Sequence, residues 1–433
     1  MEKREKFTDK IGFILSCTGA AIGLGNIWLF SWKLGKYGGA AFLIPYFIFM
    51  SLFAFIGLVG EISFGRMMKK GVLEVPKYFK NKIINYFPLV PIVAVTGIYI
   101  FYVIVFGWVI KYFYLYLVGD INHIDYEQYF FSFAGTSQSI PWHLIGIILS
   151  IGIISIGVVK GIEKLNKIVM PLMFIIFIGL LINTLKLDGA MNGVNYLIQP
   201  KWEELLKIET WVMALGQAFF TVGISGAALL VYGSYLKDDV NIVDSVIKTC
   251  ILDTIAALMA GFIIIPAAFA FNLNITSGPA LLFITIPTIF KNIPFGNFLG
   301  AIFFLSIIFA ALSSTVNLLE VPVETLIEKF NISRKKSSII VALISLVLGL
   351  VLDINIELFG KFADFMSGIL LPIGAVLILG CYFYGIPENK IIDEISKSGN
   401  KKLSYIILKV GKYIFIPGTI IIILLGIFYG NIG

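Results

Sequence analysis

Two apolar segments of this sequence are each interrupted near the middle by glycine residues. Residues 19–26 read Gly-Ala-Ala-Ile-Gly-Leu-Gly-Asn, and residues 219–226 read Phe-Phe-Thr-Val-Gly-Ile-Ser-Gly. Glycine weakens a helix, and an unpaired backbone group in lipid costs several kcal/mol. Irregular backbone inside a membrane is therefore expected only where it lines a cavity or is buried in protein. A notch for helix packing explains either stretch equally well when that stretch is taken alone.

The two interruptions occupy corresponding places, because they fall in the first and the sixth of eleven apolar segments. Such a pair predicts a transporter of two inverted repeats with its binding site near the middle of the membrane. Each break exposes a half-helix amino terminus, which favours an anion, and a half-helix carboxyl terminus, which favours a cation. A zwitterionic ligand that binds together with a metal cation suits a site of this kind.

Other polar residues fall near the middle of apolar segments, where an ionisable group is costly and is a candidate for function. Asp253 has no Lys or Arg three or four residues away, so its partner is not local. A hard cation such as sodium, which prefers oxygen ligands, is one candidate partner, and a protonated carboxyl bonded between helices is the alternative. For Tyr102 the alternative is packing. For Ser313 and Ser314 it is hydrogen bonding within their own helix.

Three glutamates also lie within apolar segments. Glu61 and Glu320 are expected to form hydrogen bonds between helices and not to bind ligands. Glu324 is closer to the end of its segment, where a long side chain can reach the membrane surface or pair with another helix.

The composition defines the class of protein. Hydrophobic residues make up 58% of the chain and charged residues 14%, with a mean hydropathy of +0.94. A soluble domain is about a quarter charged, so this is a multi-span membrane protein whose spanning elements are helices. The net charge of +7 does not indicate nucleic-acid binding, because most Lys and Arg lie in short loops between apolar segments. No nucleophile–base pair and no metal-ligand spacing is evident, so the sequence does not predict an enzyme.

The expected fold is an all-α polytopic membrane protein with a 5+5 inverted repeat, broken spans one and six, and an eleventh span. The spans are predicted at residues 11–32, 40–68, 86–118, 142–160, 163–183, 206–236, 243–272, 298–329, 337–353, 361–384 and 405–430. Lys and Arg are enriched in alternate loops, which predicts a cytoplasmic N-terminus and an extracellular C-terminus. The predicted organisation is a cytoplasmic segment (1–10), the first repeat (11–183), an extracellular loop (184–205), the second repeat (206–384), a cytoplasmic loop (385–404) and the last span with the C-terminus (405–433). An extracellular hairpin is expected near residues 277–295.

Five motifs resemble the neurotransmitter:sodium symporter family, whose structural prototype is a bacterial leucine transporter. They are Gly19-Ala-Ala-Ile-Gly-Leu-Gly-Asn-Ile-Trp28, Gly38-Gly39-Ala-Ala-Phe42, Gly161-Ile-Glu-Lys-Leu-Asn-Lys-Ile-Val-Met-Pro171, Gly216-Gln-Ala-Phe-Phe-Thr221 and Ala310-Ala-Leu-Ser-Ser314. The likeness runs in order from about residue 4 to about residue 429, and the motifs are specific in combination. The absence of a twelfth span is similar to some prokaryotic members, which implies a prokaryotic cell membrane.

The resemblance implies two sodium sites and a substrate site between spans one, three, six and eight. The first sodium site would use Ala21, Asn26, Thr221 and Asp253, together with the carboxylate of the substrate. The second would use Gly19, Ile22, Ala310, Ser313 and Ser314. The substrate would contact Ala20, Ala21, Gly23, Leu24, Gly25, Ile98, Tyr102, Phe220, Thr221, Gly223, Gly226, Ser314 and Leu318. Within that set, Tyr102 would bind the carboxylate and Phe220 would close over the substrate.

The sequence departs from the family at several of these positions. Ala20 stands where monoamine carriers have an aspartate, so the resemblance favours an amino acid over an amine. Leu29 replaces the arginine of the outer gate, whereas the acidic partner, Asp364, is present, with Lys33 and Lys361 as candidate partners. The outer gate must therefore work differently.

Two further departures concern the ligands. Asp253 stands where the family more often has asparagine, and a fixed negative charge there implies that transport does not need chloride. Gly223 and Gly226 are small, and the family prototype has a bulkier aromatic residue at the latter position. This implies room for a substrate larger than leucine, including an aromatic one.

The implied function is sodium-coupled import of a hydrophobic L-amino acid by alternating access. On the cytoplasmic side, Arg4 and Glu328 match the inner-gate ion pair of the family, with Phe7 and Tyr235 as neighbours. The expected partners are the amino acid and the lipid bilayer, the expected ions are two Na+, and no organic cofactor is implied. The alternatives are a channel-like or sensor-like protein on the same scaffold and a carrier coupled to protons through Asp253.

Overall fold

The computed structural model describes residues 5–224, 226–273, 281–397 and 399–429, and all the regular elements in these ranges are helices. The α-helices are α1 (Lys10–Ala21), α2 (Phe30–Lys36), α3 (Ala40–Phe49), α4 (Phe55–Met68), α5 (Leu89–Val118), α6 (Tyr126–Phe133), α7 (Ile140–Ile154), α8 (Lys164–Leu185), α9 (Ala190–Ile198), α10 (Trp202–Leu205), α11 (Ile208–Thr221), α12 (Ala228–Ser234), α13 (Ile242–Ala270), α14 (Ile286–Lys291), α15 (Gly296–Phe330), α16 (Arg334–Asp353), α17 (Ile356–Asp364), α18 (Leu371–Gly380), α19 (Glu388–Ser396), α20 (Lys401–Val410) and α21 (Ile416–Tyr429). Among the shorter π-helical elements, η1 (Gly25–Leu29), η7 (Val158–Glu163) and η8 (Leu281–Thr285) bear on the site.

Nine described helical segments are long and apolar enough to cross a membrane. They are Ala40–Met68, Lys82–Val118, Ser137–Ile154, Val158–Leu185, Ile242–Ala270, Gly296–Phe330, Arg334–Asp353, Ile356–Gly385 and Lys401–Gly426. A tenth segment consists of Lys10–Ala21 and Gly25–Lys36, which meet at an angle of 60°. The segment predicted at 206–236 is divided into α11 and α12, each too short to cross alone.

Two predicted boundaries need correction or qualification. The sequence predicts residues 158–160 at the end of the fourth span, but in the structure they belong to the next span. Gly157 has a φ of +110°, which ends the continuous helix before η7 begins. Part of the hairpin predicted near residues 277–295 lies outside the described residues, and the rest forms η8 and the short helix α14.

The first break follows a well-capped helix. The Asp9 side chain accepts a hydrogen bond from the backbone N–H of Gly12 (2.7 Å), which satisfies a free donor at the start of α1. Helical backbone stops at Ile22, whose ψ of 112° is extended, and resumes in η1. The second break contains two left-handed residues, Gly223 (φ +59°) and Ala227 (φ +58°). Ala227 is a strained position, since a side chain disfavours positive φ.

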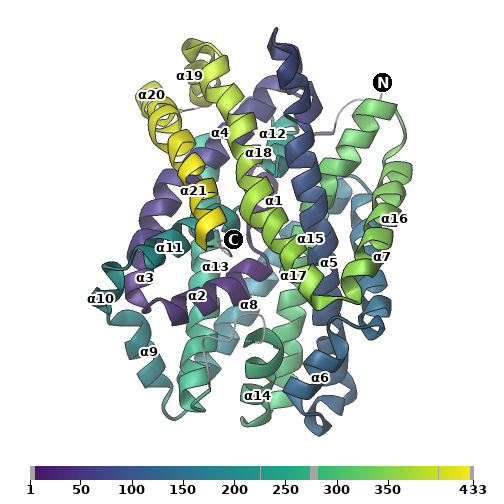
Figure 1. Ribbon diagram of the computed structural model, residues 1–433, viewed down its shortest axis with the longest axis vertical. Helices are drawn as coiled ribbons and strands as arrows, with labels where there is room; N and C mark the ends of the chain where they lie inside the picture. Colours follow the sequence, from purple (N-terminus) through teal and green to yellow (C-terminus); the bar gives the residue numbers. More distant parts are fainter. Residues whose placement is uncertain (1–4, 225, 274–280, 398, 430–433) are drawn as a thin grey trace.

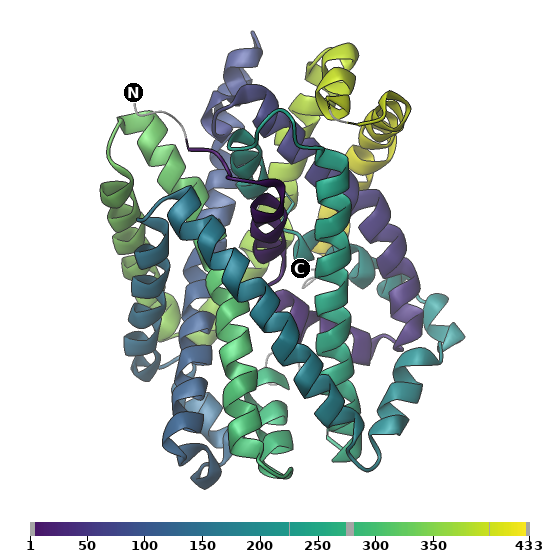
Figure 2. The same ribbon diagram turned by 180° about the vertical axis from the view of Figure 1, so that it is seen from behind.

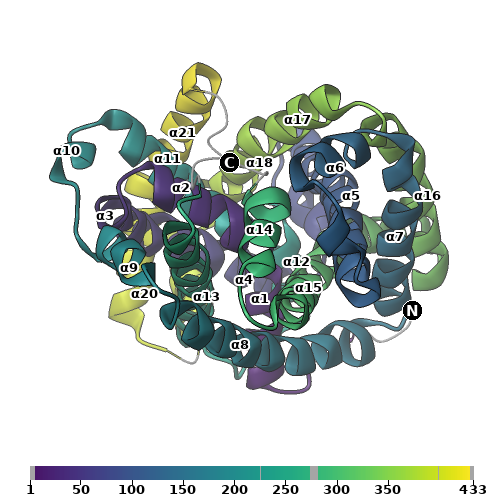
Figure 3. The ribbon, with the colours of Figure 1, turned by 90° about the horizontal axis from the view of Figure 1, so that it is seen from below.

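The helices form one bundle with two distinct ends (Figure 1). Helices α19 and α20 lie at the top of the view, and α6 and α14 lie at the bottom. We call these the α19 end and the α14 end. Seen from behind, the long helix α8 crosses the bundle obliquely beside the upright α13 (Figure 2). Seen from the α14 end, α14 lies near the centre of the view, among α2, α13 and α15 (Figure 3).

Helices α4 and α12 pack backbone against backbone. A Cβ atom added to Gly65 would lie 1.8 Å from the Leu230 carbonyl oxygen, and one added to Gly233 would lie 2.3 Å from that of Ile62. Neither position has room for a side chain, so this contact depends on glycine at both helices. The second half of the sixth segment is thereby held against the second segment.

Candidate functional site

A cavity lies where the two breaks meet, and the space in and around it, open solvent included, is about 590 Å³. Its walls come from the two broken segments, from α5 and α15, and from the start of α18. The lining residues are Ala20, Ala21, Gly23, Gly25, Asn26, Val95, Ile98, Tyr102, Phe220, Thr221, Gly223, Gly226, Ala228, Ser314, Asn317, Leu318 and Leu371. The structure thus brings together two stretches about 200 positions apart in the sequence, as the paired glycine breaks predict.

All the residues predicted to contact substrate line this cavity except Leu24. The Leu24 side chain is buried, and its backbone N–H donates to the Tyr102 hydroxyl (2.9 Å). Four lining residues were not predicted: Val95, Ala228, Asn317 and Leu371. Val95 lies three residues before Ile98, so helical spacing could have identified it. Leu371 has no comparable signal, because its segment carries no polar residue that points to the site.

Glycine is needed where the first broken segment meets its neighbours. A Cβ atom added to Gly23 would lie 2.5 Å from the Tyr102 hydroxyl oxygen and 2.8 Å from Ser314 Oγ. A Cβ atom added to Gly25 would lie 2.9 Å from Cε1 of Phe220. The two glycines therefore allow the backbone of the break to approach α5, α11 and α15 closely.

One polar cluster beside the cavity contains Asn26, Thr221 and Asp253. Asn26 Nδ2 donates to Asp253 Oδ1 (2.7 Å) and to Thr221 Oγ1 (2.9 Å), and Thr221 Oγ1 donates to Asp253 Oδ2 (3.2 Å). Asn26 Oδ1 accepts from the backbone N–H of Gly23 (3.0 Å), which ties the side chain to the break. All three side chains are buried, and Asp253 is fully so. The partner of Asp253 is thus non-local, as its sequence neighbours indicate.

A second polar cluster joins α15 to the end of α1. Ser313 Oγ donates to the carbonyl oxygens of Ala310 (2.8 Å) and Gly19 (2.9 Å). Ser314 Oγ donates to the carbonyl oxygens of Ile22 (3.0 Å) and Gly19 (3.3 Å). The serines therefore bond across to the broken segment as well as within their own helix. The five residues of the predicted second sodium site lie together and present only oxygen atoms to one another.

Aromatic rings pack together near the α14 end, and we call them the aromatic cluster. Phe283 of η8 is fully buried at its centre. Its ring centroid lies 5.0 Å from that of Tyr112, 5.2 Å from Phe130, 5.9 Å from Trp108 and 6.3 Å from Trp28. Trp28 is adjacent to Leu29, where the family resemblance predicts a gate arginine. Sequence patterns give no signal for this cluster, because its rings come from four separate elements.

The charged residues predicted near that gate lie in different environments. Lys33 is fully buried in α2, whereas Asp364 is exposed at the end of α17. Lys361 forms an ion pair with Glu357 (2.5 Å), one turn earlier in its own helix.

At the α19 end, the N-terminal segment is held by charged and aromatic residues. The Phe7 ring is buried against Phe13, Tyr232 and Tyr235, and its backbone N–H donates to the Tyr235 carbonyl (3.2 Å). Glu163 accepts hydrogen bonds from the backbone N–H (2.9 Å) and hydroxyl of Thr8 and pairs with Lys167 (2.8 Å). Lys167 also pairs with Asp9 (2.7 Å), and this contact lowers the pKa of the Asp9 carboxyl.

The predicted inner-gate pair is Arg4 and Glu328. Arg4 lies outside the described residues. Glu328 Oε1 accepts from the backbone N–H of Gly71 (2.9 Å). Glu320 accepts from the Tyr235 hydroxyl (2.6 Å) and from both terminal nitrogens of Arg334 (2.6 and 3.0 Å), so it bonds between helices as predicted.

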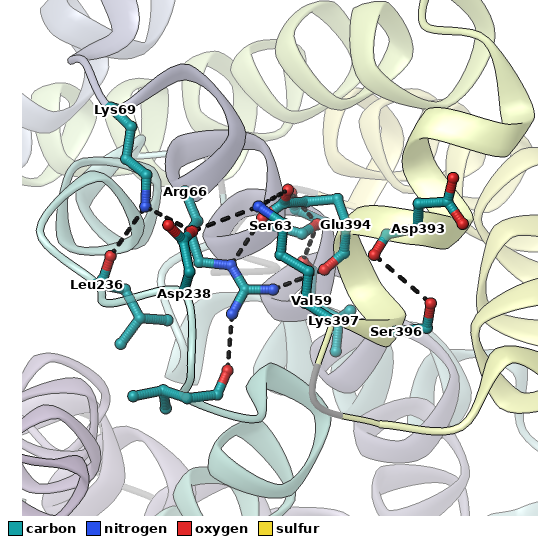
Figure 4. A network of polar contacts seen from close by, with 12 residues as sticks. Val59, Ser63, Arg66, Lys69, Leu236, Asp238, Asp393, Glu394, Ser396 and Lys397 are labelled. Atoms are coloured by element: carbon teal, nitrogen blue, oxygen red, sulfur yellow. Dashed lines mark hydrogen bonds and ion pairs between the residues drawn. The ribbon is translucent and has the colours of Figure 1, made fainter.

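A buried arginine joins three segments at the same end (Figure 4). Arg66 of α4 is fully buried, with Nε 2.6 Å from Glu394 Oε1 of α19. Its terminal nitrogens donate to the carbonyl oxygens of Glu394 (2.6 Å) and Val240 (2.7 Å). Lys397 pairs with Glu394 (2.7 Å) and with Asp238 (3.3 Å). We call this group the arginine clamp.

Comparisons with known proteins agree with this arrangement. The model of the sodium:neurotransmitter symporter family matches residues 4–127 and 119–429. An uncharacterized sodium-dependent transporter of Bacillus subtilis (strain 168) is 32% identical over 446 residues, covering 98% of each chain. Another from Methanocaldococcus jannaschii is 29% identical over 433 residues, covering 93% of this chain and 86% of its own.

A solved structure is similar along almost the whole chain. It is the crystal structure of MhsT in complex with L-phenylalanine, with a TM-score of 0.90 and 32% sequence identity, covering 98% of this chain and 99% of that one. The chain therefore belongs to the sodium:neurotransmitter symporter family of sodium-dependent transporters, with the helical fold of that family, and it is a transporter and not an enzyme.

Proposed function

We propose that this protein imports a hydrophobic L-amino acid, including an aromatic one, together with sodium by alternating access. The observation that carries the proposal is the cavity between the two breaks. Its lining is mostly apolar, and two polar clusters adjoin it. This is the arrangement that a zwitterion with an apolar side chain and co-bound cations requires.

Two sodium ions are proposed as co-substrates. The first would bind between Asn26, Thr221, Asp253 and the carbonyl of Ala21, and the second between Gly19, Ile22, Ala310, Ser313 and Ser314. Both sets offer oxygen atoms, the ligands that hard cations prefer. In the first set, Asn26 directs its nitrogen toward Asp253 (2.7 Å). An ion there would take the place of that nitrogen, so the Asn26 amide must turn to present its oxygen.

The substrate carboxylate is assigned to the break in the first segment. The Tyr102 hydroxyl accepts a hydrogen bond from the Leu24 N–H, so its own proton remains available for a carboxylate oxygen. The carboxylate would also complete the first sodium site. Ala20 contributes no charge in the cavity wall, which leaves the substrate to supply its own negative group.

The side chain of the substrate is assigned to the apolar part of the cavity. Val95, Ile98, Leu318 and Leu371 line it, and Gly226 adds no bulk. MhsT, which has the same fold, was crystallised with L-phenylalanine. An apolar side chain is therefore the best match for the residues that line this part of the cavity.

Coupling follows from differential affinity. Each ligand favours the conformation that binds it better, so sodium and the amino acid together shift the population toward the closed, loaded state. The α19 end is proposed to face the cytoplasm of a prokaryotic cell, with the C-terminus outside. The residues assigned to the gates are Leu29, Asp364, Tyr102 and Phe220 on the outer side and Arg4 and Glu328 on the inner side.

Chloride independence is proposed because Asp253 places a fixed carboxylate beside the first sodium site. If this is correct, the Asp253→Asn variant gains sensitivity to chloride. Full sodium dependence without any response to chloride in that variant would contradict the role of Asp253.

The function is tested by uptake of radiolabelled amino acids into proteoliposomes of purified protein. We expect accumulation above equilibrium that requires an inward sodium gradient and is unchanged when gluconate replaces chloride. Ser313→Ala, which removes a proposed sodium ligand, is expected to weaken sodium dependence. Equilibration without sodium would indicate a channel-like protein, and accumulation driven by a proton gradient alone would indicate a proton-coupled carrier.

A further inference from the structure

One polar side chain in the cavity wall has no part in either sodium cluster. Five polar residues line the cavity: Asn26, Tyr102, Thr221, Ser314 and Asn317. The first four take part in the hydrogen bonds described above. Asn317 is 6% exposed, and its Oδ1 has no hydrogen-bond partner among the residues that the structure describes.

Helical geometry places Asn317 beyond the polar clusters. It follows Ser314 by three residues on α15, so the two side chains share a face and are separated by about 4.5 Å along the axis. Because α15 starts at the α14 end, this displacement is toward the α19 end. Ala228 of α12 is another lining residue from the region beyond the second break. Asn317 therefore lies away from the Leu24–Tyr102 contact that is assigned to the carboxylate.

The remaining side chains of the cavity lining are apolar. Val95, Ile98, Leu318 and Leu371 offer no hydrogen bonds, and Gly223 and Gly226 add no side chains. A buried acceptor without a partner costs about 1–3 kcal/mol, and a small number of placed polar groups in an apolar pocket usually sets specificity. Oδ1 is closed off from the cavity in this conformation, so the Asn317 amide must turn toward the cavity before a ligand can reach it. A substrate whose side chain ends in a donor would satisfy Oδ1 once the amide has turned, whereas a pure hydrocarbon would leave it unpaired.

We infer that Asn317 is a specificity-determining residue that favours substrates whose aromatic side chain carries a hydrogen-bond donor, an indole N–H or a phenol O–H. The inference rests on the proposed function, since it assigns Asn317 to the side-chain end of the same cavity. A site with an acceptor discriminates against an analogue that lacks the donor, because the acceptor then stays buried and unpaired.

The test compares matched ligands with purified protein in sodium, by isothermal titration calorimetry. Tryptophan is paired with 3-benzothienylalanine, in which sulfur replaces the indole N–H, and tyrosine is paired with phenylalanine. We expect the donor-bearing member of each pair to bind about tenfold more tightly. Equal affinities within both pairs overturn the inference and leave the proposed function intact, whereas failure of every amino acid to bind overturns the proposed function itself.

Variants identify the residue responsible. Asn317→Leu keeps the size of the side chain but removes the acceptor, so it should abolish the preference within each pair while retaining sodium-dependent binding of phenylalanine. Phe298→Ala, at an exposed position of the same helix outside the cavity lining, should keep the preference. A preference that survives in Asn317→Leu overturns the assignment. If Asn317→Leu does not fold, Asn317→Ser replaces it, because serine retains an acceptor on a shorter side chain. Asn317→Ser is expected to reduce the preference in part, and an unchanged preference in that variant also overturns the assignment.

Discussion

At the two ends of this protein, different kinds of contact hold the helices together. At the α14 end, Phe283 is surrounded by the rings of Trp28, Trp108, Tyr112 and Phe130. At the α19 end, carboxylates are paired with cations between helices, as in Glu320 with Arg334 and in the arginine clamp. The aromatic cluster adjoins Leu29, where the family resemblance predicts the arginine of an ionic gate, so apolar contacts surround the position of that predicted gate.

One fold can therefore use aromatic packing at one end and buried ion pairs at the other, and these two interactions have different physical properties. Aromatic burial is non-directional and insensitive to salt, and its strength depends on the area removed from water. A buried ion pair is directional, and removing one partner leaves the other charge uncompensated. Substitutions at the two ends should therefore differ in size and in their response to ionic strength.

The largest effect is expected from breaking the arginine clamp. Arg66→Ala leaves Glu394 buried with Lys397 as its remaining cation, and we expect a loss of stability of about 4 kcal/mol, as for other broken buried pairs. Thermal unfolding of the purified variant measures it. Lys401→Ala is the control, because its pair with Asp393 is exposed (77% and 64%). Equal destabilisation by the two substitutions would contradict the buried role of Arg66.

A somewhat smaller effect is expected from opening the aromatic cluster. Phe283→Ala removes the central ring and should cost the closed α14 end about 3 kcal/mol. A cysteine placed at Leu29, with the native cysteines replaced by serine, should then react much faster with a maleimide, at any ionic strength. Phe298→Ala is the control, since that ring is 65% exposed on α15. If the cysteine reacts at the same rate in both variants, Phe283 does not hold this end closed.

The ionic contact at the α19 end should respond less strongly, and with a salt dependence. Glu320→Gln removes the charge opposite Arg334 and should loosen this end by about 2 kcal/mol. Cys17 on α1 is 1% exposed, so its alkylation rate in a Cys250→Ser, Cys381→Ser background reports the opening. Potassium chloride should raise the rate in the parent protein more than in the variant. Glu357→Gln is the control: it breaks an exposed ion pair at the opposite end and should leave the alkylation rate of Cys17 unchanged.

The smallest effect is expected at Asp238, which lies between the spans. Its hydrogen bond with Lys69 lowers the pKa of the carboxyl to about 2, with a further contribution from Lys397. Because the pKa of Asp238 is lower in the folded protein, its carboxylate stabilises the fold at pH values above its ordinary pKa, near 3.8. This contribution is lost as the pH falls through about 2. Asp238→Asn should therefore lower stability by about 0.5 kcal/mol equally at pH 5 and pH 8, because the carboxylate is largely exposed. A difference that disappeared at pH 5 would contradict the lowered pKa.

Local patterns in the sequence predict the features that depend on single segments. The glycines at 23, 25, 223 and 226 predict both breaks, because interruptions at corresponding places in the first and sixth segments are typical of an inverted-repeat transporter. Asp253 indicates a distant partner, because no cation lies within one helical turn. The residues of the two sodium sites follow from the family resemblance, and their roles remain predictions even though the structure brings them together.

Features that join several segments could not be predicted in the same way. The rings around Phe283 come from elements between residues 28 and 283, and each ring alone resembles ordinary packing. Asn317 carries no signal in the sequence beyond its spacing from Ser314. The end of the fourth span was placed too late, because Gly157 lies within a continuous apolar run and its positive φ is visible only in three dimensions.

The arginine clamp also bears on how the protein is made. Arg66 and Glu394 are 328 positions apart, so the segment that carries Arg66 is inserted long before the carboxylate of Glu394 is synthesised. Chains fold from the N-terminus as they emerge, and a buried charge without a partner is costly. Arg66 must therefore stay hydrated at the membrane surface until α19 has been translated. This end of the protein can pack fully only when synthesis is almost complete. A chain that terminates before α19 therefore leaves the Arg66 side chain exposed and without its carboxylate partner.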